Sequence, residues 1–125
     1  MCDLLLVEDH PEVLDLVHQA LELRGYAVQV CGSAEDALTF LVSGAPCQAI
    51  LSDIDLGRGM DGFAVVERAR RGRPGLRALY YSGHARPPPG RELGEGERFL
   101  EKPFSRLALF DLLDELGVRP GGTAR

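Results

Sequence analysis

Five polar residues of this chain directly follow short apolar runs, and their chemical types could together bind a cation and a phosphoryl group. In chain order they are Glu8, Asp9, Asp53, Ser82 and the only lysine, Lys102. Carboxylates gathered at one point repel one another, and a bound cation relieves that repulsion. An anionic site made only of oxygen ligands suits Mg²⁺. A cation bordered by a hydroxyl and an ammonium provides the groups that phosphoryl transfer requires.

In that chemistry Asp53 would be the nucleophile, while Ser82 and Lys102 would each hold one phosphoryl oxygen. Lysine suits a crowded phosphate pocket because it is a compact point charge, whereas the planar fork of arginine needs more room. Each residue also has a simpler interpretation. Asp53 could form a turn, Glu8 and Asp9 could stabilise the start of the next helix, Ser82 could be a turn hydroxyl, and Lys102 a surface charge. Their common position after apolar runs favours the functional interpretation.

The elements that must position these residues alternate along the chain between apolar runs and helical periodicity. The predicted strands cover residues 3–7, 26–31, 48–52, 76–81 and 98–101, and helices are predicted to begin at Pro11, after Ser33, near Phe63 and after Ser105. Such alternation is typical of parallel strands joined by right-handed crossovers, with helices on both faces. We expect one α/β domain with a doubly wound, flavodoxin-like, five-stranded parallel sheet. In strand order 2-1-3-4-5, the acidic residues would converge at the carboxyl edge.

One segment departs from this regular pattern. Residues 84–97, HARPPPGRELGEGE, occupy the place of the fourth crossover helix, and their prolines and glycines predict a shortened or irregular helix. Asp61-Gly62 predicts a helix N-cap followed by a glycine that the backbone geometry requires. We expect residues 1–118 to form the domain and residues 119–125 to be a flexible tail.

Composition narrows the classes of function. The net charge of −5 argues against a nucleic-acid surface, which would need clustered basic residues. Cys2, Cys31 and Cys47 have no metal-ligand spacing, and the odd number favours reduced thiols in a cytosolic protein. No apolar run has the length of a membrane span. The sequence therefore predicts a cytoplasmic protein that binds neither nucleic acid nor membrane directly.

Four segments together resemble the motif blocks of response-regulator receiver domains of two-component signalling, and in particular those of single-domain chemotaxis-type regulators. In chain order they read LLLVEDHP, AILSDIDLGRGMDG, YYSGH and FLEKPF. The resemblance covers residues 3–117. It implies that Asp53 accepts the phosphoryl group, and that Glu8, Asp9, Asp53 and the backbone carbonyl of Asp55 bind Mg²⁺.

The same resemblance implies roles for further residues. Ser82 would follow the phosphoryl group when the domain switches, and Phe99 would rotate inward behind it, although a phenylalanine on a short strand could equally be static packing. Asp55 and His84 occupy the two positions that influence the lifetime of the phosphoryl group. The peptide bond between residues 102 and 103 is commonly cis in the family, which the following proline makes tolerable.

The leading hypothesis is a signalling receiver that catalyses only its own phosphorylation and dephosphorylation. The phosphoryl donor would be a histidine kinase or a histidine phosphotransfer protein, and phosphorylation would switch the surface that regulates an unknown downstream protein. We expect a monomer or a weak dimer, because the irregular segment 84–97 interrupts the face through which such domains dimerise.

Two alternatives remain to be distinguished. Asp53 to Asp55, DID, also resembles the nucleophile motif of haloacid-dehalogenase-type phosphatases, but in those enzymes the acidic metal pair follows the lysine. Here the only late acids spaced i, i+3 after the lysine are Asp111 and Asp114, on a predicted helix. A flavin or nucleotide binder is disfavoured because the loop after the first strand offers carboxylates rather than the amides that cradle phosphate.

Overall fold

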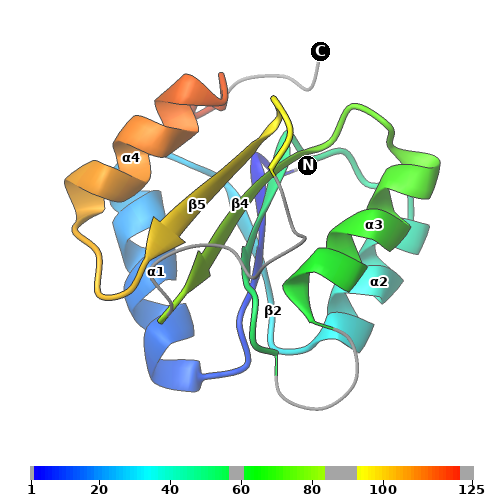
Figure 1. Ribbon diagram of the computed structural model, residues 1–125, viewed down its shortest axis with the longest axis horizontal. Coiled ribbons are helices and arrows are strands. Elements are labelled where there is room, and N and C mark those ends of the chain that lie inside the picture. The colour runs from blue at the N-terminus through cyan, green and yellow to red at the C-terminus, as the bar shows by residue number, and fades with distance from the viewer. Residues whose placement is uncertain (1, 57–60, 84–92, 122–125) are drawn as a thin grey trace.

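The computed structural model describes residues 2–56, 61–83 and 93–121, which form a sheet covered by helices on both faces (Figure 1). The strands are β1 (Leu4–Val7), β2 (Val28–Cys31), β3 (Ala49–Asp53), β4 (Arg77–Ser82) and β5 (Glu97–Glu101). The helices are α1 (Pro11–Leu23), α2 (Ala34–Val42), α3 (Gly62–Gly72) and α4 (Arg106–Glu115). No helix in this part of the chain has the length and apolar character that crossing a bilayer needs.

All five strands are parallel, and their order in the sheet is β2-β1-β3-β4-β5. This confirms the predicted fold class and strand order. Figure 1 shows α1 and α4 on one face of the sheet and α2 and α3 on the other. The order reverses direction between β1 and β3, and open α/β sheets bind their ligands beside such a point.

Local chemistry sets the ends of the helices. Ser33, Asp61 and Ser105 are the N-caps of α2, α3 and α4, and each side chain accepts a hydrogen bond from the backbone N–H three residues later. Gly25 and Gly117 follow α1 and α4 with φ of 99° and 78°, a left-handed conformation that glycine adopts without steric cost. The predicted N-cap at Asp61 and the predicted helix starts after Ser33 and Ser105 are confirmed.

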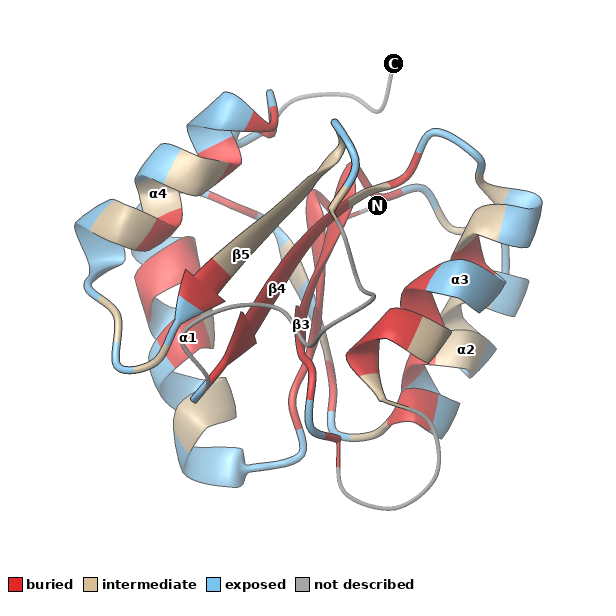
Figure 2. Cartoon of the chain, in the orientation of Figure 1, coloured by how far each residue is buried: buried red, intermediate tan, exposed pale blue. Residues whose placement is uncertain are grey.

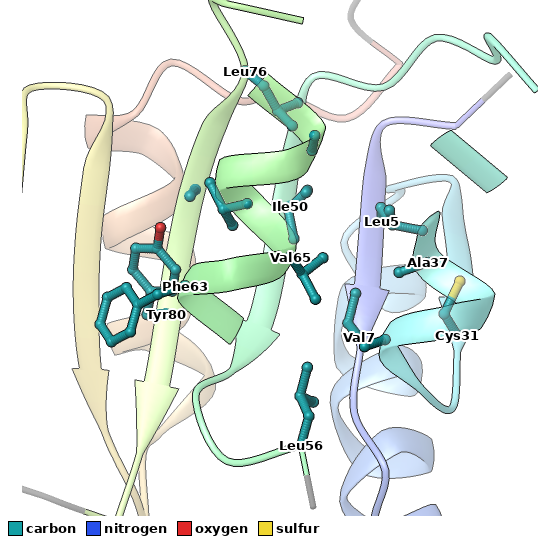
Figure 3. Close-up of a cluster of buried hydrophobic side chains, with 14 of the residues drawn as sticks. Leu5, Val7, Cys31, Ala37, Ile50, Leu56, Phe63, Val65, Leu76 and Tyr80 are labelled. Carbon is teal, nitrogen blue, oxygen red and sulfur yellow. The ribbon is translucent and has the colours of Figure 1, made fainter. Parts of the chain in front are cut away.

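The core forms two layers because side chains alternate between the faces of each strand. On β1, Leu5 and Val7 pack toward α2 and α3, whereas Leu4 and Leu6 pack toward α1 and α4. Figure 3 shows the first layer, in which the rings of Phe63 and Tyr80 lie 4.5 Å apart. The central strands are buried along their length (Figure 2), as expected for a parallel sheet covered on both sides.

Two predictions concern segments at the limits of the described residues. The irregular fourth helix was predicted for residues 84–97, and residues 84–92 lie outside the part that the structure describes. Beyond residue 118, the N–H of Arg119 donates to Oε1 of Gln48 (3.2 Å), and the N–H of Gly121 donates to Oδ2 of Asp3 (3.0 Å). The start of the predicted tail therefore has partners on the sheet, and the domain boundary at residue 118 stays a prediction.

Candidate functional site

Strand register brings the predicted residues to one edge of the sheet. Val7 at the end of β1 pairs with Ser52, and Asp53 at the end of β3 pairs with Tyr81. Ser82 is the last residue of β4 and pairs with Glu101 of β5. The carboxyl edge of the sheet therefore carries four of the predicted residues, each at the end of a strand or directly after one: Glu8, Asp53, Ser82 and Lys102.

The ammonium of Lys102 connects two of the carboxylates. Its Nζ donates to Oδ2 of Asp53 at 2.8 Å and lies 3.6 Å from Oε1 of Glu8. The backbone N–H of Lys102 donates to the carbonyl of Ser82 (2.7 Å), which fixes the start of the loop after β5. The Lys102–Pro103 peptide bond is cis, as the family resemblance implied. The other oxygen of Asp53, Oδ1, accepts the N–H of Asp55 at 2.9 Å.

Glu8 is a fully buried carboxylate whose two oxygens both have donors. The Tyr81 hydroxyl donates to Oε1 at 2.8 Å, and the His10 N–H donates to Oε2 at 3.0 Å. Burial raises the pKa of Glu8; these two hydrogen bonds act against that shift, and the nearby charge of Asp53 adds to it. Partial burial by itself would lower the pKa of Lys102, but the hydrogen bond with Asp53 and the charge of Glu8 raise it above its usual value.

Tyr81 belongs to this site, although the sequence pattern did not single it out. Its ring centroid lies 5.0 Å from Nζ of Lys102 and 5.6 Å from the ring of Phe104. Burial, together with the charge of Glu8, raises the pKa of the phenol well above its usual value. A buried tyrosine usually finds a partner for its hydroxyl. One feature of the sequence could have identified Tyr81. It is a tyrosine near the end of a predicted strand, at the edge where the strand-end acids were expected.

The loop after β1 presents further potential ligand atoms. Glu8, Asp9 and His10 each offer one ligand atom, and the three atoms lie within 4.8 Å of one another. Asp9 and His10 are exposed. Mg²⁺ prefers oxygen ligands and retains waters, so the buried carboxylate of Glu8 and the exposed carboxylate of Asp9 fit that ion by their chemistry. Asp53 is not one of the three residues in this group. His10 was not among the predicted site residues.

The remaining predicted residues have different surroundings. Ser82 is fully buried, and the side chain of Asp55 is exposed. Phe99 on β5 is partly buried against the core layer that contains Phe63 and Tyr80. His84 lies outside the described residues. The switching and lifetime roles of these residues stay predictions.

Gly62 packs closely against the backbone at the end of β3, next to Asp53. Its N–H donates to the carbonyl of Ile54 (2.9 Å), and a Cβ added at this position would collide with the backbone carbonyl oxygen of Asp53 and lie 3.0 Å from Oγ of Ser52. Its φ is not positive. The glycine is therefore needed for close packing of α3 against β3 rather than for an unusual backbone conformation.

A doubly wound parallel sheet with acids directly after β1 and at the end of β3, and a lysine after β5, defines an α/β domain of the receiver type. The chain belongs to the response regulator receiver domain family, whose family model matches residues 4–114. Receivers of this family act in two-component systems, interact with histidine kinases and downstream effectors, bind Mg²⁺ at the acidic pocket, and are not classical enzymes.

Individual relatives agree with this membership. The chain is 31% identical over 115 residues to the sensor kinase CckA of Brucella abortus, a match that covers 90% of this chain. It spans 12% of that kinase, and 38% and 23% of two curated regulatory proteins. A receiver protein structure from Sinorhizobium medicae is 29% identical, with a TM-score of 0.84 and coverage of 92% and 93% of the two chains. TrrA of Thermotoga maritima, solved with Mg²⁺-BeF, shares the fold at 20% identity, with a TM-score of 0.81 and coverage of 93% and 99%.

Proposed function

We propose that this chain accepts a phosphoryl group on Asp53 and thereby changes the surface that it presents to a partner protein. The observation that carries the proposal is the contact of one ammonium, that of Lys102, with Asp53 at 2.8 Å and with Glu8 at 3.6 Å. Phosphoryl transfer depends on positioned groups that neutralise developing negative charge. A lysine already paired with the acceptor carboxylate supplies such a group without rearrangement of the backbone.

Glu8, Asp9, Asp53 and the backbone carbonyl of Asp55 would hold Mg²⁺ at this edge. The ion, when bound, would neutralise charge on the phosphoryl oxygens and lower the repulsion between that group and the carboxylates. Two observations support the fit: the carboxylate of Glu8 is fully buried, and Glu8 and Asp9 present ligand atoms within 4.8 Å of each other. TrrA, which has the same fold, was solved with Mg²⁺-BeF.

The residues of the chain would divide the remaining work. The N–H of Asp55, which donates to Oδ1 of Asp53, orients the acceptor carboxylate. Lys102 would hold one phosphoryl oxygen and the hydroxyl of Ser82 another, and Phe99 would move inward behind Ser82. The exposed side chain of Asp55, with His84, would set how quickly water removes the phosphoryl group.

The phosphoryl donor would be a histidine kinase or a histidine phosphotransfer protein. A groove of about 370 Å³ between α1 and α4 borders the site through Phe104, two residues after Lys102. Leu16 and Leu23, which line it, are 68% and 76% exposed. Because the donor must bring a phosphohistidine to Asp53, this neighbouring apolar groove is where we place its docking helix.

The phosphatase alternative is less consistent with these residues. Asp111 and Asp114, the late acids that it would need, are exposed on α4 rather than at the end of a strand. Asp114 pairs with Arg24 at 3.0 Å. Both acids therefore lie on a helix surface, and Asp114 already has a cationic partner.

The test is the intact mass of the protein after incubation with Mg²⁺ and acetyl phosphate. We expect one added phosphoryl group on the wild type and none on Asp53→Asn. Asp111→Asn, which removes an exposed acid from α4, is the matched control and should be phosphorylated like the wild type. Phosphorylation of Asp53→Asn at the wild-type level would refute the assignment, and sustained turnover of p-nitrophenyl phosphate would favour the phosphatase.

A further inference from the structure

A second groove lies at the opposite edge of the sheet, between the carboxyl-terminal ends of α2 and α3. It has a volume of about 870 Å³, and its wall includes the segments that precede β3 and β4. Those strands begin at this edge and end at the edge that carries Asp53. The groove is therefore separate from the phosphoacceptor pocket and from the groove between α1 and α4.

The charge of the groove contrasts with that of the chain. The sequence has 19 acidic and 14 basic residues, yet no residue that lines the groove is acidic. Four of its lining residues are arginines: Arg68, Arg71, Arg73 and Arg77. A concave surface lined by one sign of charge concentrates its electric field and attracts ligands of the opposite sign.

Two of these arginines connect the segments that line the groove. Arg73 donates to the carbonyl of Leu41 (3.3 Å) and contacts Sγ of Cys47 (3.8 Å). Arg77 donates to the carbonyls of Gln48 (3.3 Å) and Leu116 (2.9 Å). These hydrogen bonds hold α2, β3 and β4 in place, so Arg73 and Arg77 both have a structural role.

The other two arginines have no such explanation. Arg68 and Arg71 are exposed, and within the described residues neither side chain has a hydrogen bond or an ion pair. Arg71, in the last turn of α3, interacts favourably with the helix dipole. Arg68 lies before the last turn, where that effect has fallen off. Two guanidinium groups are thus available to a ligand on one rim of the groove.

The facing rim is apolar. Val42, the last residue of α2, is 86% exposed, and Leu38 and Leu41 beside it are only partly buried. Exposed apolar side chains next to arginines are typical of protein interfaces, where arginine is enriched. A groove between two helices also fits an amphipathic helix better than it fits a flat bilayer surface.

We propose that this groove binds an acidic amphipathic segment of a partner protein. Carboxylates of the segment pair with Arg68 and Arg71, and its apolar side chains cover Val42 and Leu38. Because the groove lies at the edge opposite Asp53, the docking does not require phosphorylation. The contact keeps a partner bound while Asp53, at the other edge, is phosphorylated and dephosphorylated.

The test uses a fluorescein-labelled peptide of about 14 residues, with leucines on one helical face and glutamates elsewhere. Fluorescence anisotropy should show saturable binding to the wild type and affinity at least about tenfold lower for the double variant Arg68→Glu/Arg71→Glu. The control, Arg24→Glu/Arg119→Glu, changes the net charge equally at exposed sites outside both grooves and should bind like the wild type. Asp53→Asn should also bind normally, which separates this result from the phosphorylation test.

A second variant and a second readout keep the test independent of folding defects. Val42→Ser, at a highly exposed position, should weaken binding without lowering the melting temperature. Amide NMR shifts on titration should concentrate at Leu41, Val42 and Gly72. The proposal is overturned if the peptide does not bind, if the control loses the same affinity, or if Val42→Ser binds unchanged. Binding only to phosphatidylglycerol vesicles or to a DNA duplex would overturn it as well.

Discussion

Replacing Tyr81 with phenylalanine removes the hydroxyl that donates to the buried carboxylate of Glu8. Both side chains are fully buried, so water cannot replace the lost donor. Hydrogen bonds to charged groups contribute about 1.5–3 kcal/mol to stability, whereas neutral ones contribute about 0.5–1.5 kcal/mol. We expect Tyr81→Phe to lower the free energy of unfolding by about 2 kcal/mol at neutral pH without Mg²⁺.

The other two tyrosines of the chain provide reference substitutions, because all three tyrosines are buried. Tyr26 donates to the neutral carbonyl of Val118 (3.1 Å), so Tyr26→Phe should cost about 1 kcal/mol. Tyr80 donates to Glu97 (2.7 Å), which retains other donors when that hydroxyl is removed. Tyr80→Phe should therefore cost less than Tyr81→Phe.

Urea unfolding of the wild type and the three variants, with EDTA and with millimolar Mg²⁺, measures these differences. Mg²⁺ at Glu8 would stabilise the folded state by mass action and would offset the charge that Tyr81 otherwise stabilises. The cost of Tyr81→Phe should therefore shrink with Mg²⁺, whereas that of Tyr26→Phe should not change. A cost for Tyr81→Phe no greater than that for Tyr26→Phe, or independent of Mg²⁺, would refute this account of the pocket.

Three further outcomes are expected. Gly62→Ala should destabilise the protein by about 1–3 kcal/mol in urea unfolding, since the new methyl meets the Asp53 carbonyl, whereas Gly72→Ala, with nothing within 4 Å, should be nearly neutral. Glu97 is partly buried, which acts to raise its pKa, but hydrogen bonds from its neighbours and the charge of Arg70 lower it. Its stabilisation is present above the unfolded pKa of about 4.3 and is lost as pH falls through the lower folded value, so Glu97→Gln should cost stability at pH 7 and little near pH 3. Equal costs at the two pH values would contradict this. Lys102→Arg should still gain a phosphoryl group by mass but lose the phosphorylation-dependent change in the amide NMR spectrum; a change like that of the wild type would contradict the proposed coupling.

The fold could be predicted because several independent signals in the sequence agree. The runs LLLV and AILS, alternating with capped amphipathic segments, fit only a parallel sheet covered on both faces. The carboxyl ends of such strands lie at one edge, and in the order 2-1-3-4-5 the first and third strands are neighbours, so the acids at their ends lie close together. The irregular helix predicted for residues 84–97 stays a prediction, because residues 84–92 lie outside the described part of the chain.

Contacts between side chains on different strands could not be predicted in the same way. The role of Tyr81 depends on the register of β3 with β4, and the need for glycine at position 62 depends on how closely α3 approaches β3. The arginine groove requires knowing that the ends of two helices lie side by side. Spacing along the sequence carries none of these distances, whereas a tyrosine or an arginine in an amphipathic pattern has many ordinary explanations.

The hydrogen bond between Glu8 and Tyr81 also explains why a glutamate is useful at the end of β1. Because β3 lies between β1 and β4, this bond spans the strand that carries Asp53. Strands two places apart are separated by roughly 10 Å, a distance that a short aspartate would bridge less readily than a glutamate. The same carboxylate lies 3.6 Å from the ammonium of Lys102, which itself contacts Asp53. Three strands are thus connected through one buried acid, and the position of the acceptor carboxylate depends on that connection.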